Sequence, residues 1–288
     1  MTQPVRVGLV GAGPWARLAH APLLSGGPET QLVGIWARRS EAAEELAAKH
    51  GSRAVGTYDE LLDSCEAVAF AVPPEVQGRM ATEAAKAGKH LLLDKPVADS
   101  VEAAQLLADA VAEAGVSTMV LLTYQFTEAL RRFLPQARAL KPSGAAHENI
   151  SGGFLAGPFS QSPWRHEGGV LPDVGPHVVD LFTTILGPAV GGEVQTCQGL
   201  VRLGLRHESG AFSHAVLSAH HTGAGAHSLR VYAPGGVLDC DWDVPDEDRW
   251  GTVRREFAAS VRTGAPHACD VHRGLELQRV LNRAIAGG

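Results

Sequence analysis

The sequence predicts an α/β protein with an N-terminal doubly wound Rossmann domain and a C-terminal α+β domain that carries an open mixed sheet. Three observations support this fold class. Strand and helix patterns alternate with short connections over the first 122 residues, the first strand runs directly into a glycine turn, and 288 residues exceed what one hydrophobic core usually serves. We therefore expect two domains, at residues 1–122 and 123–288.

Short apolar segments predict the strands of the first domain. They lie at 5–10, 31–36, 67–72, 90–93 and 117–122, with helices expected between them at 40–50, 58–63, 75–87 and 100–114. The continuous apolar run at 67–72 is typical of a sheet that is buried on both faces. Thr57 and Glu60 form a capping box, Ser100 caps the last of these helices, and Gly51 and Gly115 stand where helices end.

The second domain has weaker signals. Strands are expected at 147–154, 194–205, 211–221 and 228–233, and a helix at 250–263.

The first strand is followed by Gly11-Ala12-Gly13-Pro14-Trp15-Ala16, a G-x-G-x-x-A turn. The first glycine permits the tight turn, the second lets the backbone approach a pyrophosphate, and the small Ala16 lets helix and strand pack closely. The free N–H groups of the helix N-terminus favour the phosphates. A turn that merely joins strand to helix is the alternative, but the position after an N-terminal strand favours a dinucleotide site.

The second strand ends in Arg38-Arg39-Ser40, where an acidic residue usually accepts the ribose 2′-hydroxyl of NAD. Guanidinium groups and a hydroxyl suit a 2′-phosphate instead, so the sequence favours NADP over NAD. The alternative is that the arginines are solvated residues before a helix whose N-cap is Ser40.

Other strand ends carry further candidates. Val72 is followed by Pro73-Pro74, a rigid edge without N–H groups, and the strand at 90–93 is followed by Asp94-Lys95-Pro96. Because parallel strands end at one edge of a sheet, these residues meet the glycine turn there. Pro96 keeps Lys95 extended, with a bond that could be cis, and its ammonium could stabilise a developing alkoxide. A surface Asp–Lys pair is the alternative.

Composition excludes several classes. The net charge of −6 and the lack of a Lys/Arg cluster argue against nucleic-acid binding, and no apolar run reaches the roughly 18 residues of a membrane span. Four cysteines without a C-x-x-C motif, and no recognisable signal peptide, predict reduced thiols in a cytoplasmic protein. His220-His221 alternate faces in an expected strand and have no third partner at suitable spacing, so no metal site is expected.

Taken together, these segments resemble the Gfo/Idh/MocA oxidoreductase family, named for glucose–fructose oxidoreductase and inositol dehydrogenase. The resemblance covers nearly the whole chain. It is carried by the glycine turn and by residues 71–74, 87–97, 164–181, 229–236 and 257–261.

The resemblance implies three catalytic residues: Lys95, Asp173 and His177, the last as general acid/base. A histidine suits removal of a hydroxyl proton near neutral pH, and a four-residue spacing puts Asp173 and His177 on one face if the segment is helical. Pro176 requires that this helix start late or kink. A simple helix-surface Asp–His contact is the alternative.

The resemblance also implies binding residues. Those expected at the cofactor are Gly11, Ala12, Gly13, Pro14, Trp15, Arg38, Arg39, Ser40, Val72, Pro73, Gln77, Lys95 and Gln125. Those expected at the substrate are Lys95, Tyr124, Trp164, Asp173 and His177.

Some positions depart from the family pattern. Asp94 replaces a glutamate, Gln77 stands where a histidine is common, and Gln125 replaces an arginine, which puts that cofactor contact in doubt. The chain is also shorter than is usual, with the loss expected after Leu238.

The sequence therefore predicts an NADP-dependent oxidoreductase that transfers a hydride between nicotinamide and a hydroxyl or carbonyl carbon of a sugar, cyclitol or related small molecule. Homo-oligomerisation through the C-terminal sheet is expected from the resemblance. A glycoside-cleaving relative that retains its cofactor, or a non-catalytic dinucleotide sensor, stays open as an alternative.

Overall fold

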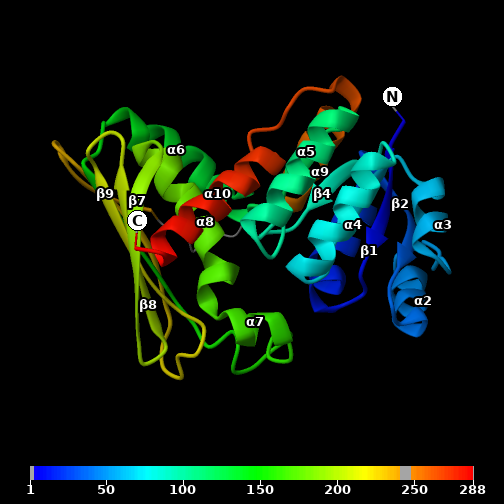
Figure 1. Ribbon diagram of the computed structural model, residues 1–288, viewed down its shortest axis with the longest axis horizontal. Coiled ribbons are helices and arrows are strands. Elements are labelled where there is room, and N and C mark those ends of the chain that lie inside the picture. Colours follow the sequence, from blue (N-terminus) through cyan, green and yellow to red (C-terminus); the bar gives the residue numbers. More distant parts are fainter. Residues whose placement is uncertain (1–2, 241–247, 288) are drawn as a thin grey trace. The chain divides into compact units, whose positions relative to one another are not determined.

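The computed structural model describes residues 3–240 and 248–287. The chain forms two compact units, Met1–Leu121 with Asp248–Leu275, and Leu122–Glu247 with Glu276–Gly288. The α/β fold class is confirmed, with a parallel sheet in the first unit and a mixed sheet in the second (Figure 1).

The first unit contains a parallel five-stranded sheet in the order β2-β1-β3-β4-β5. Its strands are β1 (Val5–Val10), β2 (Thr30–Trp36), β3 (Ala67–Phe70), β4 (His90–Leu93) and β5 (Thr118–Val120). Every residue of β3 is buried, as its continuous apolar sequence predicts. The helices between these strands are α2 (Ser40–Lys49), α3 (Tyr58–Ser64), α4 (Pro74–Lys86) and α5 (Val101–Ala114), of which α4 and α5 lie side by side (Figure 1).

Most of the predicted helix ends are confirmed. Thr57 Oγ1 accepts the backbone N–H of Glu60 at 3.1 Å, and the Glu60 carboxylate accepts the N–H of Gly56 at 3.0 Å. Ser100 Oγ caps α5 through the N–H of Ala103, and Gly115 ends that helix in the left-handed conformation. Ser40 differs from the prediction: it is the first helical residue of α2, and the residue before it occupies the N-cap without a side-chain bond.

The helix after the glycine turn is irregular. It begins at residue 14, widens into a π-helical turn, η1 (Ala16–His20), and continues as α1 (Ala21–Ser25). The wider turn leaves the His20 side chain completely buried, and no hydrogen-bond partner for either of its ring nitrogens lies in the described part of the chain. Such bulges often occur at functional sites.

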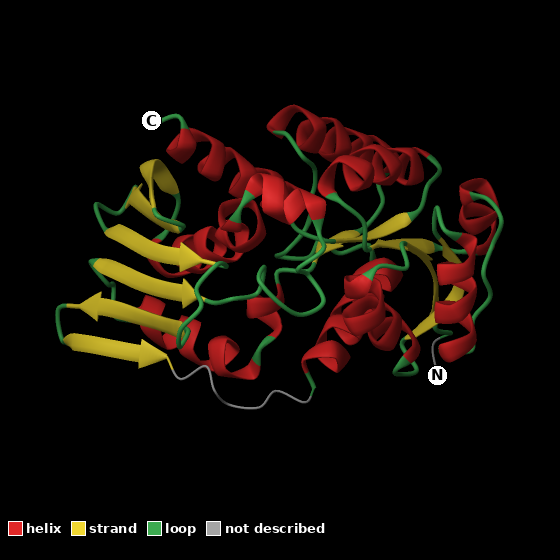
Figure 2. Cartoon of the chain, turned by 90° about the horizontal axis from the view of Figure 1, so that it is seen from below, coloured by secondary structure: helices red, strands yellow, loops and turns green. Residues whose placement is uncertain are grey.

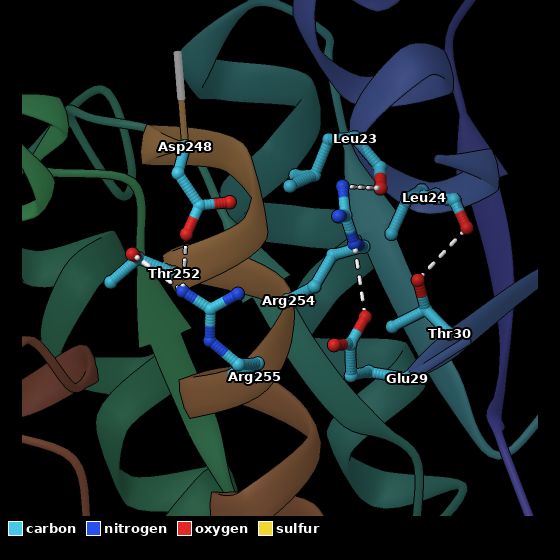
Figure 3. A network of polar contacts seen from close by, with 8 residues as sticks. All are labelled: Leu23, Leu24, Glu29, Thr30, Asp248, Thr252, Arg254 and Arg255. Atoms are coloured by element: carbon cyan, nitrogen blue, oxygen red, sulfur yellow. Dashed lines mark hydrogen bonds and ion pairs between the residues drawn. The ribbon is translucent and has the colours of Figure 1, made fainter. Parts of the chain in front are cut away.

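Helix α9 (Arg249–Thr263) belongs to the first unit, although the sequence placed residues 123–288 together in the second domain. The reason is long-range packing that no local pattern reveals. Phe257 is buried, Ser117 Oγ donates to the carbonyl of Ser260 at 3.0 Å, and Arg254 Nε donates to Glu29 at 3.1 Å (Figure 3).

The second unit contains a six-stranded mixed sheet in the order β11-β10-β6-β9-β8-β7. Its strands are β6 (Gly144–Ile150), β7 (Ala189–Cys197), β8 (Leu200–His207), β9 (Phe212–Ser218), β10 (Ala226–Ala233) and β11 (Gly236–Cys240). The single strand expected at 194–205 is instead a β7–β8 hairpin, which turns at Gln198 and Gly199 with φ of +47° and +82°. Gln is an unusual residue for a positive φ, so the turn gave no sequence signal.

The helices of this unit lie on one face of its sheet (Figure 2). They are η2 (Thr123–Phe126), α6 (Glu128–Ala139), α7 (Pro163–Gly168), α8 (Val170–Leu186) and the last part of α10 (Val271–Ile285). Helix α8 packs on β6, β8 and β9, and no described helix covers the opposite face of the sheet.

Candidate functional site

The carboxyl ends of four neighbouring strands lie along one edge of the parallel sheet. Strand β1 lies between β2 and β3, so the strand order changes direction there, and ligands of open α/β sheets bind at this switch point. The residues that follow β1, β2, β3 and β4 are Gly11, the Arg38 segment, Val72 with Pro73, and the Lys95 segment.

The two glycines of the turn meet different surroundings. Gly11 has φ +112°, and a Cβ there would lie 2.4 Å from the carbonyl oxygen of Ala71 at the end of β3. A Cβ at Gly13 would meet no atom within 4 Å. Gly11 is thus required by the fold itself, whereas Gly13 borders open space in which a ligand can approach the backbone.

A cavity of about 600 Å³ adjoins this turn, a volume within the range of small-molecule and cofactor sites. It brings together seven of the predicted cofactor residues: Gly11, Ala12, Gly13, Arg38, Arg39, Val72 and Pro73. Trp36 and Arg79 also line it and were missed, because an arginine on a helix carries no motif and Trp36 reads as an ordinary strand residue.

The charge of the cavity wall suits a phosphorylated ligand. Three of its lining residues are arginines, and none of the described lining residues is acidic. Arg38 and Arg39 are exposed at the end of β2, and Arg79 Nη1 lies 3.3 Å from the Glu83 carboxylate on the surface of α4. With the open space at Gly13, these residues fit an NAD(P)-type dinucleotide.

Six predicted cofactor residues are not among those that line this cavity: Pro14, Trp15, Ser40, Gln77, Lys95 and Gln125. Pro14 is exposed in the first turn of the helix, and Ser40 is exposed at the start of α2. The Trp15 ring contacts the rings of His20 and Trp250 edge-on, at centroid distances of 6.4 and 6.3 Å.

Lys95 lies in a short loop between β4 and α5. The Lys95–Pro96 peptide bond is cis, Lys95 is half-buried, and its N–H donates to Asp94 Oδ1 at 2.8 Å. The other carboxylate oxygen of Asp94 lies 3.9 Å from Nε2 of the buried His20. The loop therefore holds one lysine at the strand edge that carries the glycine turn.

Gln77 is predicted to contact the cofactor. Its side chain is buried and is not among the residues that line the cavity. Its amide instead binds the backbone of the loop at Asp94, Pro96 and Val97.

In the second unit, Asp173 and His177 lie one turn apart on α8. The helix runs from Val170 through Pro176 to Leu186, so the expected helical spacing of the pair is confirmed. His177 is buried, and its ring stacks on Tyr124 with centroids 4.6 Å apart and 29° between the planes.

Asp173 has an ion-pair partner that no sequence motif indicates. Arg165 Nε on α7 lies 3.3 Å from Asp173 Oδ1, and both side chains are mostly buried. The Arg165 guanidinium lies over the rings of Phe159 and Trp164, 4.6 and 4.4 Å from their centroids. Trp164, expected at the substrate, therefore helps to fix the cation beside Asp173.

Tyr124 connects His177 to polar residues of the sheet. Its hydroxyl accepts a hydrogen bond from Asn149 Nδ2 at 3.0 Å and lies 3.3 Å from His227 Nε2. Burial, assisted by the neighbouring His227, lowers the pKa of His147 to about 4. These sheet residues were missed because their positions alternate with core residues and match no motif.

Gln125 is a further predicted cofactor residue, and its side chain contacts α8. Its amide nitrogen donates to the buried Asp180 carboxylate at 2.6 Å and to Thr184 Oγ1 at 3.2 Å, both on α8. Gln125 therefore ties η2 to the helix that carries Asp173 and His177.

Two further properties follow from the described residues. No three or more of their His, Cys, Asp and Glu side chains are grouped as metal ligands would be. None of the helices in the described ranges is long and apolar enough to span a membrane.

A parallel sheet with a glycine turn and a wide cavity at its switch point defines a Rossmann-type dinucleotide-binding protein. Residues 5–122 match the sequence profile of the oxidoreductase family with an NAD-binding Rossmann fold. The N-terminal part of the chain is therefore similar to the Gfo/Idh/MocA oxidoreductases, and the match covers the whole parallel sheet of the first unit.

Individual proteins show the extent of the similarity. The chain is 31% identical to glucose-6-phosphate 3-dehydrogenase of Bacillus subtilis (strain 168), over 42% of this chain and 34% of that protein. It is 27% identical to 4-carboxy-2-hydroxymuconate-6-semialdehyde dehydrogenase of Sphingobium sp., over 96% of both chains. The crystal structure of GenD2 from gentamicin A biosynthesis, in complex with NAD, shares the fold with a TM-score of 0.87, 21% identity and coverage of 99% of this chain and 94% of that one.

Proposed function

We propose that this protein is an NADP-dependent oxidoreductase that transfers a hydride between nicotinamide and a hydroxyl or carbonyl carbon of a sugar, cyclitol or related small molecule. The observation that carries the proposal is the cavity at the switch point, which is lined by three arginines and by the glycine turn with its open space at Gly13. The sugar-related names of relatives such as the glucose-6-phosphate 3-dehydrogenase of Bacillus subtilis support the substrate class.

The preference for NADP rests on charge. Arg38 and Arg39 follow β2 where an acidic residue would bind the 2′-hydroxyl of NAD, and Arg79 adds a third guanidinium to the same cavity. Such groups bind a 2′-phosphate through charge-assisted hydrogen bonds.

The chemistry assigns roles to three residues. A bound nicotinamide would supply or accept the hydride. A ring nitrogen of His177 would take the hydroxyl proton during oxidation and return it during reduction, with Asp173 beside it on α8. The Lys95 ammonium would stabilise the alkoxide that develops at the reacting oxygen.

The experiment is a panel of polyols, sugars and ketones assayed with NADP and NAD, with nicotinamide absorbance as the readout. In the Arg38→Ala/Arg39→Ala double variant we expect the Kd for NADPH to rise at least tenfold and the Kd for NADH to change less than threefold. Equal losses for both cofactors, or tighter use of NAD by the wild type, would refute the NADP assignment.

A second pair of variants tests the catalytic roles. His177→Ala and Lys95→Ala should bind NADPH normally and lose at least a hundredfold in turnover, since general acid–base catalysis contributes on the order of 10²–10⁴. Unchanged turnover in both would refute the site. Hydrolysis of a glycoside without net NADPH formation would favour the glycoside-cleaving alternative.

We also propose that the protein forms homo-oligomers in the cytoplasm through the uncovered face of the second sheet. Leu200, Phe212 and Val237 are exposed large apolar side chains on its strands, and exposed apolar patches often mark interfaces. Light scattering after gel filtration should give a multiple of 30.2 kDa, and Phe212→Asp should reduce it. A monomeric wild type would refute the proposal.

A further inference from the structure

Gln77 lies on the buried face of α4, and its carboxamide is fully engaged with one loop. Its Nε2 donates to the carbonyl oxygens of Asp94, Val97 and Pro96, at 2.8, 3.0 and 3.2 Å. Its Oε1 accepts the N–H of Asp94 at 2.8 Å. Only 1% of Gln77 is exposed, so these bonds form away from solvent, where each is costly to lose.

The hydrogen bonds of Gln77 reach the backbone on both sides of Lys95, but none of them is made to the backbone of Lys95 itself. One contacted residue precedes Lys95 and two follow it, so the amide fixes the main chain on both sides of the lysine. The Lys95 N–H is held separately by the Asp94 carboxylate at 2.8 Å. The position from which the Lys95 side chain starts is therefore set by α4 rather than by the loop alone.

Close packing brings α4 near enough for this contact. A Cβ at Gly78, the next residue, would lie 2.9 Å from the Cβ of Ala98, so a larger residue there would push helix and loop apart. On the other side of the loop, a Cβ at Gly274 would lie 2.5 Å from a methyl group of Val97. Val97 and Ala98 are completely buried, and the loop therefore has little room to shift.

The chemistry of the carboxamide explains why glutamine suits this place. It donates and accepts at the same time and carries no charge, so its bonds do not depend on pH. The two N–H groups of the carboxamide donate to three carbonyl oxygens, so one N–H group must be shared between two of the carbonyls. A leucine of similar size offers neither function, and a histidine loses its acceptor when it is protonated.

We propose that Gln77 is a positioning residue, which holds the Asp94–Val97 backbone so that the Lys95 ammonium is presented in one fixed place. This inference rests on the proposed role of Lys95 in hydride transfer.

The test measures Lys95 itself as well as turnover. Trace acetylation with acetic anhydride, read by peptide mass spectrometry over a pH series, reports the reactivity of the Lys95 amine. In Gln77→Leu we expect this reactivity to change at least threefold and kcat to fall at least tenfold, with the Kd for NADPH within threefold of the wild type. Gln105→Leu, which removes the bond from Gln105 to Asp109 on the exposed surface of α5, should change none of these.

Gln77→His covers the case in which the leucine variant does not fold. Because its imidazole keeps one donor and one acceptor only while neutral, Lys95 reactivity should acquire an additional pH dependence at acidic pH. Unchanged Lys95 reactivity in the folded variants, or a kcat within threefold of the wild type, would overturn the proposal. If no substrate of the panel is turned over by the wild type, the proposed function fails, and the acetylation result alone still decides whether Gln77 positions Lys95.

Discussion

The glycine turn allows a folding role and a binding role to be separated by two matched substitutions. Gly11→Ala should destabilise the protein, whereas Gly13→Ala should leave it folded and weaken cofactor binding. The contrast comes from the space around each residue: 2.4 Å to a backbone oxygen at Gly11, and no atom within 4 Å at Gly13.

The magnitude at Gly11 has two sources. A non-glycine residue in a sparsely populated backbone region costs about 1–3 kcal/mol, and overpacking against a rigid neighbour costs about 1–3 kcal/mol more. At Gly11 the φ of +112° causes the backbone cost, and the close approach to the Ala71 carbonyl oxygen causes the overpacking cost. A loss of about 3 kcal/mol corresponds to a fall in Tm of roughly 6–12 °C for a chain of this size.

Gly13→Ala should change the free energy of unfolding by less than about 1 kcal/mol, because its φ is not positive and its Cβ meets no atom. The added methyl group would instead occupy the space that a pyrophosphate needs. We expect the Kd for NADPH to rise at least tenfold, which is about 1.4 kcal/mol.

Thermal unfolding followed by far-UV circular dichroism, and NADPH titration followed by fluorescence, check the two effects. Equal falls in Tm for both variants would contradict the structural distinction. Unchanged NADPH affinity in Gly13→Ala would show that the pyrophosphate does not approach this turn.

Two further predictions concern stability. The pKa of His147 is lowered to about 4 in the folded state, whereas an unperturbed histidine has a pKa near 6.5. The unfolded chain therefore binds more protons than the folded chain as the pH falls below about 6.5. The free energy of unfolding should fall by about 2 kcal/mol between pH 7 and pH 5. Urea titrations at several pH values should show that this pH dependence of the free energy of unfolding is removed in His147→Phe and kept in His221→Gln. The same pH dependence in both variants would contradict the prediction. Arg254→Ala should cost about 1–3 kcal/mol, because it leaves the mostly buried Glu29 carboxylate unpaired. Hydrogen exchange should detect faster opening of α9 in this variant but not in Arg255→Ala, and equal exchange would refute the role of the pair.

The features predictable from sequence were those set by local chemistry. The strands at 5–10 and 90–93 have the predicted bounds, and Thr57 and Ser100 cap helices as their side chains suggested. In each case, burial, helix capping or a glycine conformation is decided by residues a few positions apart. The seven predicted residues that line the cavity belong to the same class, because parallel strands must end at one edge.

The features that could not be predicted depend on contacts between distant segments. Helix α9 joins the first unit through partners such as Glu29, which is 225 positions away from Arg254. The β7–β8 hairpin turns at a Gln-Gly pair, which lacks the Asn or Asp that usually marks such a turn. The direction in which Gln77 points likewise follows from the packing of α4 on the loop, and a motif cannot specify it.

The two glutamines that depart from the family pattern support segments that carry candidate catalytic residues. Neither of them is among the residues that line the cavity. Gln77 instead makes four hydrogen bonds to the Lys95 loop, and Gln125 binds Asp180 and Thr184 on the helix of His177. Both are buried or half-buried amides that satisfy neighbouring groups without adding a charge, which avoids the cost of desolvating one. Gln77 therefore anchors the Lys95 loop to α4, and Gln125 anchors η2 to the helix of His177, each within its own unit.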